Sequence, residues 1–221
     1  MQFRKDLTNQ NGSTILETYV AQHMFLKGEC PMPPKCKFSK EEIVEAALAL
    51  VREKGYDAVS ARAVGAKLGA SSKVIFSAFS GMEELKRATV QAAGELQRKF
   101  TEDYAKTSVF PLYKSIGMAY ILFARAEKEL FRLLYMRDRT GENRENELDS
   151  IAGILELLTK TLHITWQQAV VFHAEMWAYV HGIAVLLATG YEAWDEAFIS
   201  RMLTDGFAGL RIRYSQEENG Q

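Results

Sequence analysis

Apolar residues recur at helical spacing through residues 38–85, and short polar breaks divide them into three helices. The first apolar face consists of Ile43, Ala46, Ala47, Leu50 and Val51. Ser39 and Glu42 stand before this face at the spacing of a capping box, and Gly55 follows it as a helix stop. The pattern predicts a helix from about Lys40 to Lys54.

A second, shorter helix is predicted after the turn that follows Gly55. Ser60 is a candidate N-cap, because its hydroxyl can accept from a free backbone N–H at the helix start. Apolar and small residues then continue from Ala61 to Leu68. Gly69 stands where a left-handed residue would end the helix.

The third helix begins almost at once, which makes the break between it and the second helix tight. Ser71 or Ser72 can cap it, and it is expected to span Lys73 to Ala78. Ile75 and Phe79 lie four residues apart and can face inward together. The remaining side chains of this helix would then point outward.

Two short helices joined by a tight turn are a helix-turn-helix signature, here at about residues 60–79. In a DNA major groove, Lys73 could donate to guanine, and Val74 or Phe76 could contact thymine methyl groups. Basic residues on the neighbouring helices would contact phosphates, with Arg87 as a further candidate. The candidate DNA-binding residues are Arg62, Lys67, Ser71, Ser72, Lys73, Val74, Phe76, Ser77 and Lys86. The alternative is that these are ordinary solvated side chains on a structural helical corner.

The remaining chain predicts helices with no strand signal. They are expected at Met82–Tyr104, Leu112–Ala126, Lys128–Arg137, Glu145–Thr161, Trp166–Ala188 and Trp194–Tyr214. Ser80 and Glu83 again have capping-box spacing before the first of them. The fold class is therefore all-α.

Residues 38–85 resemble the N-terminal domain of the TetR family of transcriptional regulators. The matching segments are Ile43–Ala47, Glu53–Gly55, Ser60–Arg62, Leu68–Ser71, Ile75–Phe79 and Glu83–Leu85. The resemblance implies a dimeric all-α protein whose N-terminal domains each enter a major groove, and whose C-terminal domain dimerises and binds a small molecule. Two positions depart from the family pattern: Phe76 replaces the usual Tyr and so lacks a hydroxyl for phosphate, and Met82 replaces a Lys that often begins the fourth helix.

The C-terminal part is rich in aromatic residues, most of which suit plain core packing. His173, Trp177 and His181 are more suggestive, because steps of four residues align them along one side of a long apolar helix. Buried imidazole and indole groups need hydrogen-bond partners, which a ligand can supply. The candidate ligand-binding residues are Tyr104, Tyr113, Tyr120, Phe123, Phe131, Tyr135, His173, Trp177 and His181. Core histidines satisfied by neighbouring carbonyls are the alternative.

The segment Trp177–Gly182 resembles the Trp and His-Gly pattern of one C-terminal domain type among TetR-like regulators, and residues 116–131 resemble its earlier helices. This resemblance implies that the last two helices pack against those of a second copy. The implied contributors are Ile183, Leu186, Leu187, Phe198, Met202, Phe207 and Leu210. Gly182 would permit a close approach between helices.

Charge and composition add few constraints. The net charge is −1, and residues 35–87 carry ten Lys or Arg against seven Asp or Glu, a small basic excess that predicts weak non-specific DNA binding. Cys30 and Cys36 match no common zinc spacing, and no other ligand set is complete, so no metal site is expected. No nucleotide-binding glycine loop, metalloprotease helix or nucleophile elbow occurs, which argues against an enzyme and predicts no cofactor.

The chain organisation predicted from these patterns has three parts: an extension at 1–37, a DNA-binding domain at 38–98 and a regulatory and dimerisation domain at 99–221. A short amphipathic helix is expected at residues 14–27. Residues 1–31 either derive from an upstream start codon, with Met32 as the natural start, or form a true extension. No signal peptide or segment of about 20 apolar residues is apparent, which favours a cytoplasmic protein.

The sequence therefore predicts a homodimeric repressor that binds a palindromic double-stranded operator and is released by a small, mostly apolar effector. Two alternatives stay open. One is a DNA-binding protein whose C-terminal domain only dimerises and binds no ligand. The other is a helical sensor or enzyme that does not bind DNA.

Overall fold

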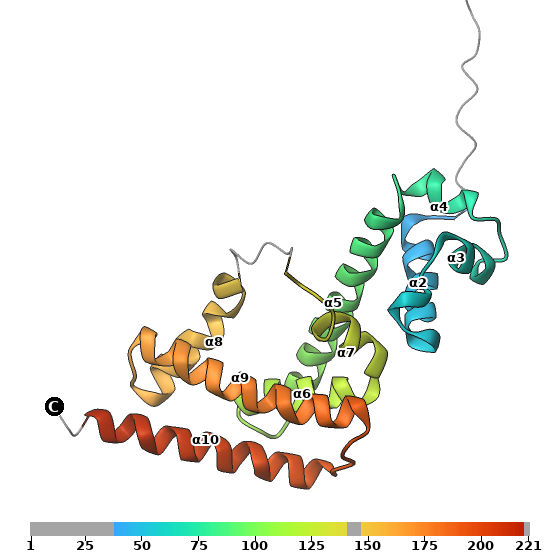
Figure 1. Cartoon of the computed structure of the whole chain (residues 1–221). Helices are drawn as coiled ribbons and strands as arrows, with labels where there is room; N and C mark the ends of the chain where they lie inside the picture. Colours follow the sequence, from blue (N-terminus) through green and yellow to red (C-terminus); the bar gives the residue numbers. More distant parts are fainter. Residues whose placement is uncertain (1–37, 141–146, 219–221) are drawn as a thin grey trace, which may run out of the picture. The chain divides into compact units, whose positions relative to one another are not determined.

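The computed structural model describes residues 38–140 and 147–218, and every regular element in these ranges is a helix (Figure 1). In chain order they are α2 (Lys40–Lys54), the 3₁₀ helix η1 (Tyr56–Ala58), α3 (Ala61–Lys67), α4 (Lys73–Ala78), α5 (Met82–Thr107), α6 (Leu112–Ala126), α7 (Lys128–Tyr135), α8 (Glu147–Leu162), α9 (Trp166–Thr189) and α10 (Glu196–Glu218). The all-α prediction is confirmed. The helix expected at residues 14–27 and both cysteines lie outside the described residues.

Helix starts in the N-terminal part follow the predicted capping at two of four positions. At α2 the capping box is present, since Ser39 Oγ accepts from the Glu42 N–H at 3.1 Å and Glu42 Oε2 accepts from the Ser39 N–H at 2.7 Å. At α3, Ser60 Oγ accepts from the Ala63 N–H at 3.2 Å. Both helices therefore begin where a side chain satisfies otherwise free backbone donors.

The capping predictions for the next two helices are wrong. Ser72 is the N-cap residue of α4 but has helical backbone angles, and its side chain makes no capping bond. At α5 the N-cap is Gly81, so Ser80 and Glu83 form no capping box. Instead, the Ser80 N–H donates to Glu84 Oε2 at 2.7 Å, one residue further along the helix.

The helix-turn-helix unit is set by one close approach between backbones. A Cβ built on Gly65 of α3 would lie 3.0 Å from both the Ser71 carbonyl carbon and the Ser72 nitrogen. Gly65 is buried, and Gly69 has the left-handed φ of 63° that the turn requires. The tight break between α3 and α4 therefore depends on glycine at both positions.

The C-terminal part is built around α6. Seven consecutive residues of this helix, Met118–Ala124, are buried, so no side of it faces solvent over two turns. Helices α5, α7, α9 and α10 all pack against it. A helix that is apolar all round must be enclosed, and these four neighbours supply the enclosure.

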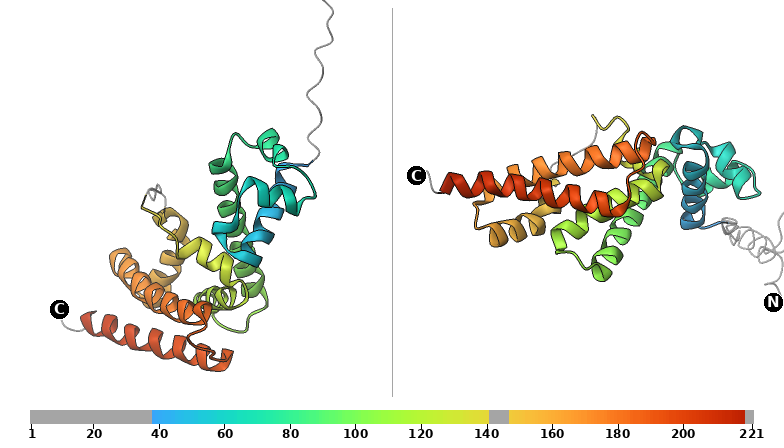
Figure 2. Two further views of the ribbon diagram at one scale, coloured as in Figure 1. Left: turned by 45° about the vertical axis from the view of Figure 1, so that its right-hand side comes forward. Right: turned by 90° about the horizontal axis from the view of Figure 1, so that it is seen from below.

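Helix α9 is unusually apolar, and α10 runs alongside it in both views (Figure 2). By length and composition α9 could span a membrane, since its mean hydropathy is 1.5 over 18 residues. The expectation that no segment approaches about 20 apolar residues is therefore wrong. Length and composition are weak grounds, because the core helix of a helical domain meets the same criterion. Its packing on α6, α8 and α10 and the ion pair of Glu175 with Arg213 of α10 at 3.0 Å fit a core helix.

Two residues expected at a dimer interface are used inside the protomer instead. Ile183 and Leu187 of α9 are each 3% exposed and belong to the protomer's own core. They lie four residues apart and so share one face of the helix. Phe198 at the start of α10, from the same predicted set, is 47% exposed and remains accessible.

The expected domain boundary at residue 98 falls inside α5, a continuous helix of 26 residues. A second link joins the N-terminal helices to the C-terminal part, because α2 packs against α7. Arg52 of α2 donates to both carboxylate oxygens of Glu127, at 2.9 and 2.8 Å. This bidentate pair raises the pKa of Arg52 and fixes the orientation of α2.

A Gly65→Ala substitution should destabilise the protein by about 1–3 kcal/mol, because its Cβ would meet backbone atoms that cannot move aside. Gly153→Ala in α8 is the matched control, since nothing lies within 4 Å of its Cβ position. That change should stabilise by roughly 0.5–1 kcal/mol through helix propensity. Urea unfolding of both variants measures the difference, and equal effects would contradict the close approach at Gly65.

Candidate functional sites

Helix α4 separates its side chains into an inner and an outer set. Ile75 is fully buried, and Phe79 just beyond the helix is also buried. Ser72 and Val74 are half-buried at the edge of this core. The predicted readers that lie exposed are Ser71, Lys73, Phe76 and Ser77. These four exposed side chains are therefore accessible to a partner.

Two of the predicted phosphate-binding cations have partners on the protein surface. Lys67 of α3 is ion-paired with Glu53, and Lys86 of α5 lies 3.5 Å from Glu83. Exposed pairs of this kind contribute only about 0–1 kcal/mol. A phosphate could replace either carboxylate at small cost.

Three further cations of the same region make no ion pair with any described residue. They are Arg62 of α3, Lys73 of α4 and Arg87 of α5, and all three are exposed. Cationic side chains without acidic partners are available to a polyanion without first losing a contact.

Phe76 is the exposed aromatic of this surface, with 56% of its area accessible. A phenylalanine ring offers no hydrogen bond, so its contribution to a partner would be apolar contact with a sugar or a thymine methyl group. Exposing such a ring has an unfavourable hydration cost unless a partner covers it.

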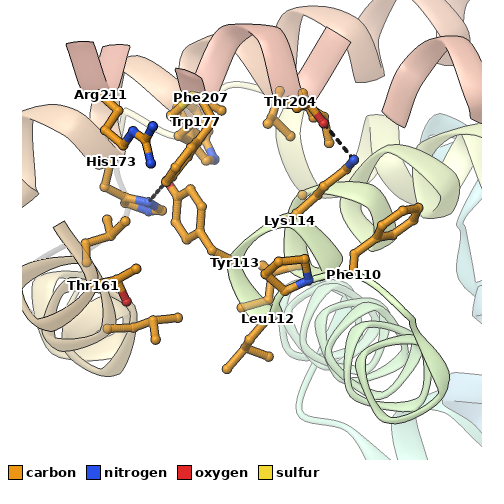
Figure 3. Close-up of a pocket in the computed structure, with 18 of the residues that line it drawn as sticks. Phe110, Leu112, Tyr113, Lys114, Thr161, His173, Trp177, Thr204, Phe207 and Arg211 are labelled. Atoms are coloured by element: carbon orange, nitrogen blue, oxygen red, sulfur yellow. Dashed lines mark hydrogen bonds between the residues drawn. The ribbon is translucent and has the colours of Figure 1, made fainter. Parts of the chain in front are cut away.

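A cavity of about 580 Å³ lies in the C-terminal part, within the size range of sites for drug-sized molecules (Figure 3). Its walls come from α6, α8, α9, α10 and the segment before α6. The lining is mostly apolar or aromatic: Phe110, Pro111, Leu112, Ile116, Leu157, Leu158, Met176, Trp177, Val180, Leu203 and Phe207 are among its residues. The cavity is therefore suited to a largely apolar molecule.

Two tyrosine–histidine pairs join α6 to α9 at this cavity. Tyr113 Oη lies 3.1 Å from His173 Nδ1, and Tyr120 Oη lies 2.9 Å from His181 Nδ1. Burial raises the pKa of both phenols and lowers the pKa of both imidazoles, so each pair stays uncharged near neutral pH. The two pairs follow the same order along both helices, so α6 and α9 run in the same direction.

The second pair continues through a ring contact and a hydrogen bond to α5. Tyr135 of α7 donates to Gln97 Oε1 at 2.9 Å, and the centroid of its ring lies 5.1 Å from that of Tyr120. Trp177 stacks on His181 with ring centroids 4.9 Å apart. Side chains on four helices are thereby connected from the cavity wall to α5.

The structure brings some of the predicted ligand-binding residues together and not others. Those that line the cavity are Tyr113, Tyr120, His173 and Trp177. Those away from its lining are Tyr104, Phe123, Phe131, Tyr135 and His181. Phe123 and Phe131 are buried in the core, whereas His181 bonds to Tyr120 and Tyr135 bonds to Gln97. A ligand contact by any of the nine stays a prediction.

Sequence reasoning missed the polar residues of the cavity. Lys114, Thr161, Thr204 and Arg211 all contribute to its wall. Lys114 could have been suspected, because it is the single charged residue in the stretch from Leu112 to Phe123. Thr161, Thr204 and Arg211 give no such signal, since polar residues at helix surfaces are common.

No cluster of three or more potential metal ligands occurs within residues 38–140 and 147–218. His173 and His181 each bond to a tyrosine hydroxyl rather than converge on one point. The described part of the chain therefore offers no geometry for a metal ion.

Two family profiles match the chain. The profile described as bacterial regulatory proteins, tetR family, matches residues 43–89, which cover α3, α4 and most of α2. The profile described as tetracyclin repressor-like, C-terminal domain, matches residues 113–205 and includes the cavity walls from α6 to α9. The chain belongs to the TetR family. A comparison with curated proteins found no match. As a TetR-family protein, the chain is a helix-turn-helix DNA-binding transcriptional regulator.

The lowered pKa values of His173 and His181 predict a loss of stability in mild acid. Below about pH 6.5 the unfolded chain takes up protons at these positions before the folded protein does, so the folded state is disfavoured as pH falls. Above that pH both states are neutral there and the contribution is constant. The double variant His173→Gln/His181→Gln should lose less stability between about pH 7.5 and 5.5.

His163→Asn is the control for this measurement, because His163 is exposed and a left-handed residue that Asn tolerates. Its loss of stability between the two pH values should match that of the unmodified protein. Urea unfolding at each pH provides the comparison. An identical acid response in the double variant would contradict the assignment of half-buried neutral imidazoles.

The hydrogen bond between Tyr135 and Gln97 should be detectable as an interaction energy of about 0.5–1.5 kcal/mol in a double-mutant cycle of unfolding free energies. The cycle combines Tyr135→Phe with Gln97→Met, which removes both polar partners and keeps their approximate size. Tyr191→Phe with Gln97→Met is the control, because Tyr191 is 79% exposed. The control pair should be additive. Additivity in the first cycle would mean that the bond contributes nothing.

Proposed function

We propose that this TetR-family regulator is a cytoplasmic, homodimeric repressor that binds a palindromic operator and is released by a small, mostly apolar effector. The observation that carries this proposal is the apolar cavity whose wall includes Tyr120, since the Tyr120 ring contacts Tyr135 and Tyr135 is hydrogen-bonded to Gln97 of α5. Helix α5 follows directly after the helix-turn-helix unit. A ligand in the cavity therefore has a physical connection to the DNA-binding helices.

The operator contacts are proposed for the outer face of α4. Lys73 has no acidic partner among the described residues, and Phe76 lies exposed on the same helix. In this proposal Lys73 donates to guanine O6 and N7 in the major groove, and Phe76 contacts apolar atoms of the neighbouring nucleotides. Arg62 and Arg87 contact phosphates, with Lys67 and Lys86 exchanging their surface carboxylates for phosphate.

Dimerisation is proposed through α9 and α10. The outward side of α9 keeps Val171 and Tyr179 exposed, together with the small residues Ala178 and Gly182. Nothing lies within 4 Å of a Cβ built on Gly182, so a second helix could approach closely there. Phe198 of α10 adds a further exposed apolar side chain. Burial of this apolar surface against a second copy would drive association.

Release of the operator by the effector requires that the effector has different affinities for two arrangements of the protein. An effector can dissociate the protein–DNA complex only if it binds more tightly when the two DNA-binding domains of the dimer are arranged so that they cannot bind the operator. Movement of Tyr120 or Trp177 around a ligand would be passed through Tyr135 and Gln97 to α5. The Arg52 and Glu127 pair would make α2 follow a displacement of α7.

The alternative of a ligand-free DNA-binding protein is weakened by the cavity. That alternative expects the aromatic residues to fill a dry, fully packed interior, whereas about 580 Å³ is open between α6, α8, α9 and α10. Well-packed protein cores contain few voids larger than a water molecule. A space of this size is better explained as a binding site.

Selection of bound fragments from the host genome, followed by fluorescence anisotropy on the recovered site, tests the DNA-binding proposal. Lys73→Ala should weaken binding to the selected operator by about 1–3 kcal/mol and change unrelated DNA much less, because a contact to guanine is sequence-specific. Lys160→Ala on α8 is the matched control and should leave both affinities unchanged. Equal losses on both DNAs would assign Lys73 to a phosphate, and recovery of no site would contradict the proposed operator binding.

A further inference from the structure

The charged residues in the cavity wall have only one sign. Lys114 and Arg211 are both cationic, and no Asp or Glu belongs to the lining. The other polar contributors are neutral hydroxyl, phenol and imidazole groups, which can both donate and accept. The wall is therefore complementary to an apolar molecule that carries one negative charge. Binding of a cation in the same place would be unfavourable.

Lys114 is the better candidate for the group that meets this charge. It extends from α6 to α10, where Lys114 Nζ donates to Thr204 Oγ1 at 2.8 Å (Figure 3). Thr204 in turn donates to the Ser200 carbonyl at 3.0 Å, so the position of its oxygen is fixed. The lysine head is thus held in place before any ligand arrives.

The lysine head has spare donor capacity. An ammonium group has three N–H donors, and Thr204 accepts one of them. Lys114 Nζ also lies 4.3 Å from the centroid of the Phe110 ring, which is an electrostatic contact and leaves the hydrogen bonds unfilled. No carboxylate of the described residues forms an ion pair with Lys114. Burial lowers the pKa of Lys114, as expected for a cation that lacks a compensating anion.

Arg211 lies at the other end of the labelled lining, near His173 (Figure 3). It is exposed on α10 and has interactions of its own. Between the two cations the wall is formed by Tyr113, Trp177 and Phe207, which offer ring faces and edges to an apolar body. A ligand anchored at Lys114 can thus extend along aromatic surface.

We propose that the cavity binds a hydrophobic monoanion, a carboxylate on a largely apolar body, with Lys114 as the partner of the carboxylate. This inference rests on the proposed function in taking the cavity to be the effector site. The apolar body provides affinity through burial, and the charge-assisted hydrogen bond selects acids over alcohols of the same shape. An amine is rejected because its charge would be buried beside a fixed cation.

A matched set of decanoate, 1-decanol and decyltrimethylammonium tests this on the full-length protein near neutral pH, below micelle-forming concentrations. Trp177 lines the cavity, so intrinsic fluorescence can report binding, and calorimetry provides an independent dissociation constant. Decanoate should bind about ten- to a hundredfold more tightly than decanol, as charge-assisted hydrogen bonds allow. The quaternary ammonium compound should bind most weakly.

Lys114→Met keeps the length of the side chain and removes its charge. In this variant the affinity for decanol should be retained, and the preference for decanoate should fall to about that of the alcohol. Lys128→Met on the exposed start of α7 is the control and should keep the full preference. Circular dichroism establishes that both variants fold.

Three results would overturn the assignment: equal binding of acid and alcohol to the unmodified protein, a preference that survives in Lys114→Met, or no binding by any of the three probes. None of these decides the proposed function, which is measured separately as operator binding and its release. If decanol releases the operator and decanoate binds no more tightly than decanol, the proposed function stands and the proposed carboxylate ligand is excluded. Loss of operator binding altogether would contradict the proposed function while leaving the acid preference measurable.

Discussion

The enclosure of α6 is the constraint on which the rest of the C-terminal part depends. Residues 118–124 have no solvent-facing side, so α5, α7, α9 and α10 must all be in place before this helix is satisfied. The cost of exposing it makes these five helices one cooperative unit. The cavity walls formed by α9 and α10 therefore pack on the same buried helix as α5.

The cavity is an exception to this dense packing, and polar contacts bound it. Empty apolar space destabilises a protein core because the lining atoms lack partners. Here Tyr113 with His173 and Tyr120 with His181 join α6 to α9 at two points that lie about two helical turns apart along each helix. A filled cavity would restore the missing contacts, which links ligand occupancy to the stability of the whole helical unit.

Local sequence signals predicted most helices, and the misses have physical reasons. The bounds of α2 were predictable because a capping box and Gly55 delimit it. The start of α5 at Met82 was also predicted, but its cap was not, since Gly81 rather than Ser80 is the N-cap residue. Helical spacing aligned His173 and Trp177 with the cavity, but it could not reveal that Gln97 receives a bond from another helix. Partners brought together by packing leave no trace in a single local pattern. For the same reason, the sequence could not show that Ile183 and Leu187 belong to the core whereas Phe198 is exposed.

The close approach at Gly65 has a consequence for how such a protein can change over evolution. Backbone contact fixes the angle between α3 and α4, while Ile75 and Phe79 anchor α4 from below. Stability is thus determined by positions that never face outward. Lys73 and Phe76 lie exposed on α4, so they can be exchanged without disturbing this packing, and a gene duplicate could change this outer surface by a few substitutions while its core stays the same.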